Sequence, residues 1–164
     1  MIEFCPVNEE DLGIIKGIYD YYILNSTATF HGREISIGEL REFLFIGNPK
    51  YPSFLIKENT EIIGYCFLTQ YKKRQAYNRT AELSIYLKPG STGKGIGAIA
   101  LKFLEAAAKM AGIHVLIGTL SSDNCASIRL FEKMNYERCA HFKNIGEKFG
   151  RILDVVVYEK ELDG

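Results

Sequence analysis

Residues 82–98 read ELSIYLKPGSTGKGIGA, and this stretch decides the fold. Polar and apolar side chains alternate over residues 82–87, which predicts a β-strand with two different faces. A proline at 89 ends the strand, and four glycines then fall between residues 90 and 97, just before an apolar pattern of helical spacing. Glycine this dense lets another group approach the unpaired amides of a helix start, where the helix dipole favours an anion. We therefore expect a strand, an anion-binding loop and a helix in succession.

The rest of the chain predicts further strands and helices around this unit. Strands are expected at residues 2–7, in two runs within 53–72 that flank a turn at 58–60, and at 79–87, 114–121, 136–146 and 150–162; helices are expected at 8–25, 37–46, 95–112 and 123–135. This order, β-α-α-β-β-β-α-β-α-β-β, is typical of the α/β (α+β) class. The central strand-helix-strand crossover predicts that residues 81–87 and 115–121 lie side by side in parallel. The other strands are expected to pair antiparallel, which gives a mixed sheet.

Composition excludes several classes of protein. With 164 residues, 47% of them hydrophobic, we expect a single domain spanning residues 1–164. Twenty basic and twenty acidic side chains cancel, so no net field attracts nucleic acid or an anionic membrane. No basic leader or long apolar run is visible, which favours a cytoplasmic location. The four cysteines and three histidines share no metal-ligand spacing, and we expect no metal.

The glycine loop allows three interpretations besides a plain turn that only starts a helix. A nucleotide P-loop fails, because Ile96 stands where that motif needs lysine. Residues 93–98 do fit the dinucleotide pattern G-x-G-x-x-A, yet Gly118 stands about where an acidic residue is needed. The third interpretation is a loop that binds the diphosphate of coenzyme A.

Residues 86–137 favour the third interpretation, because they resemble the core of the GNAT superfamily of acetyl-CoA-dependent N-acetyltransferases. Three further motifs, NSTATF at 25–30, KRQAYNRTAELSIYL at 73–87 and GEKFGRILDVVVYEKEL at 146–162, resemble its phosphinothricin and methionine sulfoximine acetyltransferase branch. The resemblance implies the GNAT fold, whose two central parallel strands splay apart, and acetyl-CoA as cosubstrate. It also implies acetyl transfer to the α-amine of a small amino acid or analogue, and a homodimer.

The resemblance assigns cofactor contacts to three segments. The diphosphate is expected at Gly93, Lys94, Gly95, Ile96, Gly97 and Ala98, the pantetheine arm along Ile85, Tyr86 and Leu87, and further contacts at Asn124 and Ser127. The chain departs from the superfamily pattern twice. Phe131 stands where many members have a tyrosine that protonates the thiolate, and Thr92 stands where Gln or Arg is frequent.

For catalysis the resemblance nominates Glu82, since an amine that is mostly protonated at neutral pH needs a base. The acceptor is expected to meet Phe30, Arg74 and Tyr77. Lys148 and Asp154 match the last motif of the branch, although Ile152 replaces its tryptophan.

Two other functions stay open from the sequence alone. One is acetylation of another amine, such as a protein N-terminus, a polyamine or an antibiotic. The other is a non-catalytic acetyl-CoA sensor, which the departures at Phe131 and Thr92 would suit.

Overall fold

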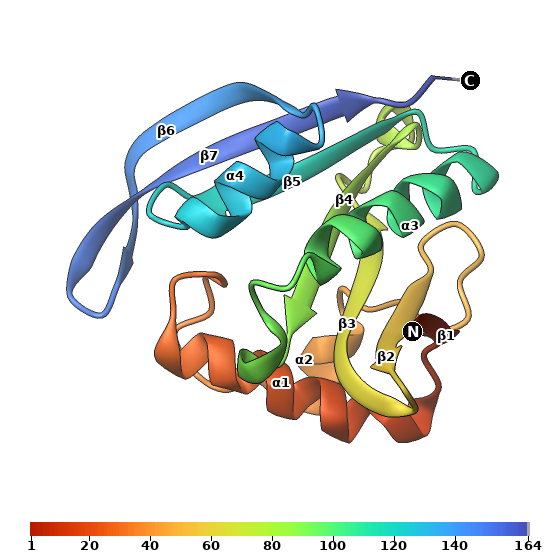
Figure 1. Cartoon of the computed structure of the whole chain (residues 1–164). Helices are drawn as coiled ribbons and strands as arrows, with labels where there is room; N and C mark the ends of the chain where they lie inside the picture. Colours follow the sequence, from red (N-terminus) through yellow and green to blue (C-terminus); the bar gives the residue numbers. More distant parts are fainter. Residues whose placement is uncertain (164) are drawn as a thin grey trace.

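The computed structural model describes residues 1–163 and contains one mixed sheet flanked by helices (Figure 1). Within this range seven strands lie in the order β1-β2-β3-β4-β5-β7-β6, and every neighbouring pair is antiparallel except β4 and β5. The strands are β1 (Ile2–Pro6), β2 (Ser53–Glu58), β3 (Glu61–Gln70), β4 (Thr80–Leu87), β5 (Val115–Ser121), β6 (Glu137–Lys148) and β7 (Arg151–Glu161); the α-helices are α1 (Leu12–Asn25), α2 (Ile37–Arg41), α3 (Ile96–Met110) and α4 (Cys125–Lys133). The predicted class and element order are therefore confirmed.

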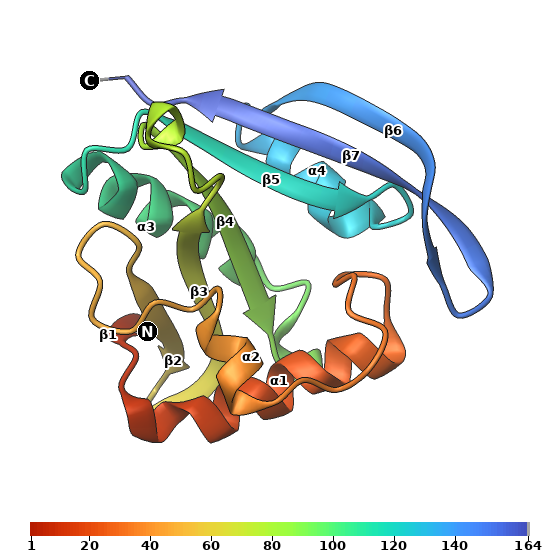
Figure 2. The same ribbon diagram turned by 180° about the vertical axis from the view of Figure 1, so that it is seen from behind.

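Two apolar clusters cover the two faces of the sheet. Helices α1 and α2 pack on one face, where Leu55, Tyr65 and Phe67 point, and α3 and α4 pack on the other face (Figures 1 and 2). From Tyr65 to Leu68 successive side chains of β3 alternate between the clusters, because a strand turns every second side chain to the same side. None of the helices in residues 1–163 is long and apolar enough to cross a membrane.

Helix α2 ends five residues before the predicted end at 46. Ser36 starts it with a capping box to Glu39, but Phe43 packs in the cluster under α1 while Phe45 packs against Tyr51 in the opposite cluster. A continued helix could not place Phe43 and Phe45 in clusters on opposite faces of the sheet. The helix therefore ends, and the chain passes from one cluster to the other.

Strands β4 and β5 part after three residue pairs. Thr80, Ala81 and Glu82 pair with residues 115–117, whereas residues 83–87 pair only with β3 and residues 118–121 only with β7. The two half-sheets also carry different helices, since α3 packs on β3 and β4 while α4 packs on β5. Figure 1 shows the two strands diverging from a common end. The parallel pair predicted over seven residues is therefore shorter, and the splay that the resemblance implied is present.

The glycine loop adopts the backbone that its sequence predicts. A short 3-10 turn at Pro89–Ser91 follows β4, and Gly93 and Gly95 then take positive φ angles of 74° and 80° before α3 begins at Ile96. Such angles are strained for residues with a Cβ atom, which explains glycine at both positions.

Gly64 on β3 fixes how closely β4 can approach. A Cβ atom there would lie 2.4 Å from the Tyr86 carbonyl oxygen and 3.0 Å from the Leu87 Cα.

Because both obstacles are backbone atoms, Gly64→Ala should lower the free energy of unfolding by about 2 kcal/mol, measured by urea denaturation. In the matched control Gly17→Ala, within α1 and with no atom inside 4 Å, stability should rise by about 0.5 kcal/mol. Equal stability of Gly64→Ala and the unaltered chain would contradict this account of the β3–β4 contact.

Candidate active site

Two adjoining hollows meet where β4 and β5 part. The first, here called the acceptor cavity, has a volume of about 380 Å³ and lies on the α1 side of the sheet. The second, here called the groove, has a volume of about 530 Å³ and runs along β4, the glycine loop and α4. Ala28, Ser84, Tyr86 and Thr119 line both hollows. The gap between the strands thus joins two spaces on opposite sides of the sheet.

The alternation along β4 distributes its side chains between these hollows. Glu82 lines only the acceptor cavity, and Leu83, Ile85 and Leu87 line only the groove. Ser84 and Tyr86 stand at the junction and line both. The two strand faces predicted from the sequence therefore correspond to two parts of one site.

The groove has the features that a long molecule with an anionic end would need. Beyond Glu82, the β5-facing edge of β4 has no strand partner, and Tyr22 donates a hydrogen bond to the Leu87 carbonyl at the far end of that edge. Gly93 and Gly95 have open space over their backbone, beside the unpaired amides of the first turn of α3. The residues present fit coenzyme A, with an amide-rich end for phosphate and an unpaired strand edge for the amide groups of its arm.

Most of the predicted cofactor contacts lie on this groove. Ile85, Tyr86, Leu87, Gly93, Gly95, Gly97, Ala98, Asn124 and Ser127 line it. Lys94 is exposed and does not line the groove, and the Ile96 side chain is buried in the core beneath α3. Asn124 caps α4 by accepting a hydrogen bond from the Ser127 amide at 3.3 Å. Its capping role and a ligand contact are compatible, because a side-chain amide also carries donors.

Two cations on the groove were missed by sequence reasoning. Arg129 and Lys133 lie one helical turn apart on α4, and both line the groove. Their i, i+4 spacing after the Asn124 motif is a signal that identifies a shared helix face. They bring positive charge to the lining of the groove, to which Lys94 does not contribute.

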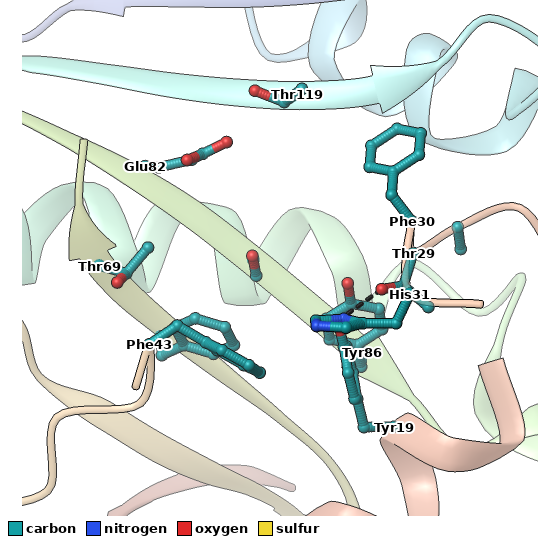
Figure 3. A pocket seen from close by; sticks show the side chains of 12 residues that line it. Tyr19, Thr29, Phe30, His31, Phe43, Thr69, Glu82, Tyr86 and Thr119 are labelled. Atoms are coloured by element: carbon teal, nitrogen blue, oxygen red, sulfur yellow. Dashed lines mark hydrogen bonds between the residues drawn. The ribbon is translucent and has the colours of Figure 1, made fainter. Parts of the chain in front are cut away.

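Glu82 is held in place from both sides. It is the last residue of β4 that pairs with β5, opposite Ile117, and on the other side it pairs with Thr69 of β3. Figure 3 shows its carboxylate in the acceptor cavity, between the side chains of Thr69 and Thr119. A carboxylate in the acceptor cavity, on a backbone that two neighbouring strands fix, is suited to act as a general base.

Aromatic rings form much of the remaining wall of the acceptor cavity. Tyr19, Phe43 and Tyr86 pack against one another, with ring centroids 5.4–5.5 Å from Tyr19 to the other two. Burial raises the pKa of the Tyr19 and Tyr86 phenols, so both hydroxyls stay protonated at neutral pH. This part of the wall is therefore uncharged at neutral pH.

The loop at residues 26–31, here called the acceptor loop, closes the cavity and is anchored by charged groups. Thr27 donates a hydrogen bond to Asp123 at 2.7 Å, and Asp123 also accepts from Ser121 at 2.6 Å and pairs with Arg151. Lys148, with only 6% of its surface exposed, donates to the Thr29 carbonyl at 2.8 Å. The loop is thereby tied to the end of β5 and to the β6–β7 hairpin.

The three predicted acceptor contacts are not all brought together. Phe30 lines the acceptor cavity, but Arg74 and Tyr77 line neither hollow. They lie on the exposed connection between β3 and β4, where Tyr77 packs edge-on against Tyr71. Their role in binding the acceptor stays a prediction.

Sequence reasoning missed most of the residues that line the acceptor cavity. Tyr19, Thr29, His31, Phe43, Phe67, Thr69 and Thr119 line it without having been predicted. They come from α1, the acceptor loop, the segment that follows α2, β3 and β5, so no single motif contains them. Thr69 pairs with Glu82 across β3 and β4, but the predicted turn at 58–60 sets only the register of β2 and β3, so Thr69 had no local signal either. The Lys148–Thr29 contact likewise joins segments 119 positions apart.

Comparison with known proteins identifies close relatives. The family described as the acetyltransferase (GNAT) domain matches residues 6–157. A phosphinothricin N-acetyltransferase of Streptomyces coelicolor is 28% identical over 98% of this chain and 96% of its own, and an L-methionine sulfoximine/L-methionine sulfone acetyltransferase of Salmonella typhimurium is 30% identical over 95% and 92%. The crystal structure of a phosphinothricin acetyltransferase of Sinorhizobium meliloti in complex with acetyl-CoA superimposes with a TM-score of 0.90, at 28% identity, over 98% of this chain and 88% of that one.

Asp123 gives a prediction about the acceptor loop. Hydrogen bonds from Ser121, then from Thr27 and Arg151, hold the pKa of its carboxyl below the ordinary 3.8. Its ionised form therefore stabilises the fold above pH 3.8, and this contribution is lost as the pH falls through the lower folded-state pKa. At pH 7, Asp123→Asn should be about 1 kcal/mol less stable than the unaltered chain, and the difference should vanish in strong acid.

Urea denaturation at several pH values measures this effect. Asp163→Asn, at an exposed position after β7, serves as the control and should show no difference at any pH. A stability deficit of Asp123→Asn that persists unchanged below pH 3 would contradict the anchoring role of the carboxylate.

Proposed function

The chain belongs to the acetyltransferase (GNAT) family, and we propose that it transfers acetyl from acetyl-CoA to the α-amine of a small amino acid or amino-acid analogue of the phosphinothricin and methionine sulfoximine type. The observation that carries this proposal is the position of Glu82, in a cavity that opens on the groove at Ser84 and Tyr86. Both substrates would be present together, and the amine would attack directly. No acyl-enzyme is needed, since none of the four cysteines lines either hollow.

The groove supplies the contacts for the cosubstrate. Backbone amides of residues 93–98, with Arg129 and Lys133, would hold its phosphates, and the unpaired edge of β4 would bond the amide groups of its arm. Asn124 and Ser127 line the opposite wall. When bound, acetyl-CoA supplies an acetyl group activated as a thioester.

Glu82 would take the proton that the acceptor ammonium must lose. An alkyl ammonium is mostly protonated at pH 7, and only the neutral amine attacks a carbonyl. A free N–H group on the β5 side of β4 would stabilise the negative charge that develops on the carbonyl oxygen. Each role follows from the same strand, which positions base and oxyanion donor a few residues apart.

Phe131 leaves the thiolate without a dedicated acid at that position. Its ring packs against Gly118, where a Cβ atom would lie 2.4 Å from the ring edge. A thiol has an ordinary pKa of about 8.5, so water can protonate the leaving thiolate at neutral pH. A phenylalanine at position 131 is therefore compatible with an active enzyme as well as with a non-catalytic sensor. The carboxylate of Glu82 in the acceptor cavity favours the enzyme, because a sensor needs no general base.

The acceptor type is supported by the size and lining of the acceptor cavity. A volume of about 380 Å³ suits one small amino acid, and aromatic side chains form much of its wall. The named activities of the relatives point the same way. A thiol-release assay over L-amino acids, phosphinothricin, methionine sulfoximine, polyamines and N-terminal peptides tests the substrate class, and exclusive turnover of polyamines or peptides would contradict it.

We also propose a homodimer that forms through the β6–β7 hairpin. Phe142, Ile145, Phe149 and Ile152 on this hairpin are 49%, 62%, 55% and 58% exposed, and β6 is an edge strand. Four large apolar side chains on one edge hairpin are unfavourable in water. A second copy offers the same surface about a two-fold axis, so each patch would cover the other.

One domain and a cytoplasmic location complete the proposal. A single sheet takes strands from both ends of the chain, and the family match covers residues 6–157. All four cysteines are unpaired, as suits a reducing compartment.

Glu82→Gln tests the catalytic base. The substitution keeps the shape and removes the proton acceptor, so kcat should fall about 100-fold or more while the Kd for acetyl-CoA stays within a factor of two. Thiol release and calorimetric titration measure the two quantities. The control Glu61→Gln alters an exposed glutamate at the start of β3 and should keep full activity. Full activity of Glu82→Gln would remove Glu82 from the mechanism.

The dimer proposal is tested by light scattering after size exclusion. The unaltered chain should show twice the chain mass, and Ile145→Arg should show the single mass, because a charge would be buried in the interface. The control Met110→Arg, at a 90% exposed position at the end of α3, should stay dimeric. A monomeric unaltered chain, or a dimer that Ile145→Arg leaves intact, would contradict the interface.

A further inference from the structure

His31 is a polar side chain of the acceptor cavity that the proposed chemistry leaves without a role. Its Nδ1 atom lies 2.6 Å from the Tyr19 hydroxyl oxygen, which lies 2.5 Å from the Thr29 hydroxyl oxygen. Tyr19 and Thr29 are only 5% and 4% exposed, whereas His31 is exposed and lines the cavity. Figure 3 shows its ring extending from the acceptor loop towards Phe43, with 6.2 Å between the ring centroids. The ring is therefore held by one nitrogen.

The other ring nitrogen, Nε2, is available to a ligand. No residue within 1–163 makes a hydrogen bond to it. When Tyr19 donates to Nδ1 and Thr29 donates to Tyr19, the neutral ring keeps its proton on Nε2. The protonated ring also carries a proton on Nε2. In these two states the hydroxyls of Tyr19 and Thr29 orient a hydrogen-bond donor at the cavity, whereas a neutral ring with its proton on Nδ1 would present an acceptor.

The charge around the acceptor loop favours an electron-rich partner for this donor. Lys148 is buried, donates to the Thr29 carbonyl two residues before His31, and has no carboxylate within 4 Å in the described part of the chain. An unpaired buried ammonium attracts negative charge and repels a cation. The nearby carboxylates are already paired, Asp123 with Arg151 and Asp20 with Lys16. The Lys148 ammonium behind Thr29 therefore favours an acceptor side chain that carries oxygen over one that carries an amine.

We propose that Nε2 of His31 donates a hydrogen bond to an oxygen at the end of the acceptor side chain, so that His31 determines specificity for acceptors with oxidised or anionic side chains. The inference rests on the proposed function and adds the residue that recognises the far end of the substrate. The α-amine lies at Glu82, the side chain follows the aromatic wall, and its oxygen reaches His31. Because Arg74 lines neither hollow, the proposal assigns this contact to His31.

The ratio of kcat/KM for methionine sulfone to kcat/KM for methionine tests the proposal, because the two acceptors differ only in the sulfone oxygens. His31→Leu should lower this ratio about tenfold, the effect of one lost hydrogen bond to a polar group. His31→Gln, whose side-chain amide also presents a donor, should keep most of the ratio. Arg33→Leu, on the same segment but outside both hollows, is the matched control and should leave the ratio unchanged.

Three results would overturn the proposal. One is an unchanged ratio in His31→Leu. Another is a loss in Arg74→Leu with none in His31→Leu. The third is a preference of the unaltered enzyme for lysine or ornithine over methionine sulfone, which would make Nε2 an acceptor.

A binding measurement separates this inference from the proposed function. In the full chain with coenzyme A bound, nitrogen NMR of labelled histidine should show Nε2 of His31 shifting with methionine sulfone and not with methionine. The chain contains three histidines, and the spectrum of His31→Gln assigns the resonance. A shift without turnover of any acceptor would reject the proposed function and keep the inference; no shift with active turnover would reject the inference alone.

Discussion

The site depends on the early separation of β4 and β5. These two parallel strands share hydrogen bonds over three residue pairs and then part, which leaves one edge of β4 unpaired inside the molecule. Unpaired backbone groups away from water are costly, so such an edge is stable only where a ligand or water can bond to it. The helices reinforce the separation, because α3 packs on one half-sheet and α4 on the other. The unpaired backbone groups along the gap are thus unfavourable in free energy, and hydrogen bonds to a bound molecule that carries amide groups can offset this.

Glu82 lies directly beside this gap. It is the last paired residue before the strands part, so its backbone is fixed on both sides, and its carboxylate lies in the acceptor cavity two residues before the junction at Ser84. The next residues of β4 belong to the groove. The Glu82 carboxylate and a row of free strand amides are thereby placed in fixed relation by one rigid element, which is more accurate than placement on separate loops.

The sequence predicted the parts of the site that lie on one continuous segment. The strand, the glycine loop, α3 and the Asn124 cap follow from alternation, positive-φ glycines and helix capping, all of which are local properties. The acceptor cavity is assembled from distant segments, so His31, Phe43 and Thr119 could not be found from spacing. Helix α2 was predicted too long, because residues 43–45 are all apolar but pack in two different clusters. The spacing of apolar residues does not show which cluster each one joins. Arg74 and Tyr77 came from resemblance alone and lie outside the cavity.

The most direct test of this account is residue-resolved hydrogen exchange with and without acetyl-CoA. Amides of residues 83–87 that do not pair with β3, and those of residues 93–98, have no strand or helix partner, and they should exchange fast in the free protein. Acetyl-CoA should slow their exchange about tenfold or more, and leave β6 unaffected. Unchanged exchange in both segments under saturating acetyl-CoA would contradict the claim that the gap beside β4 is the binding site.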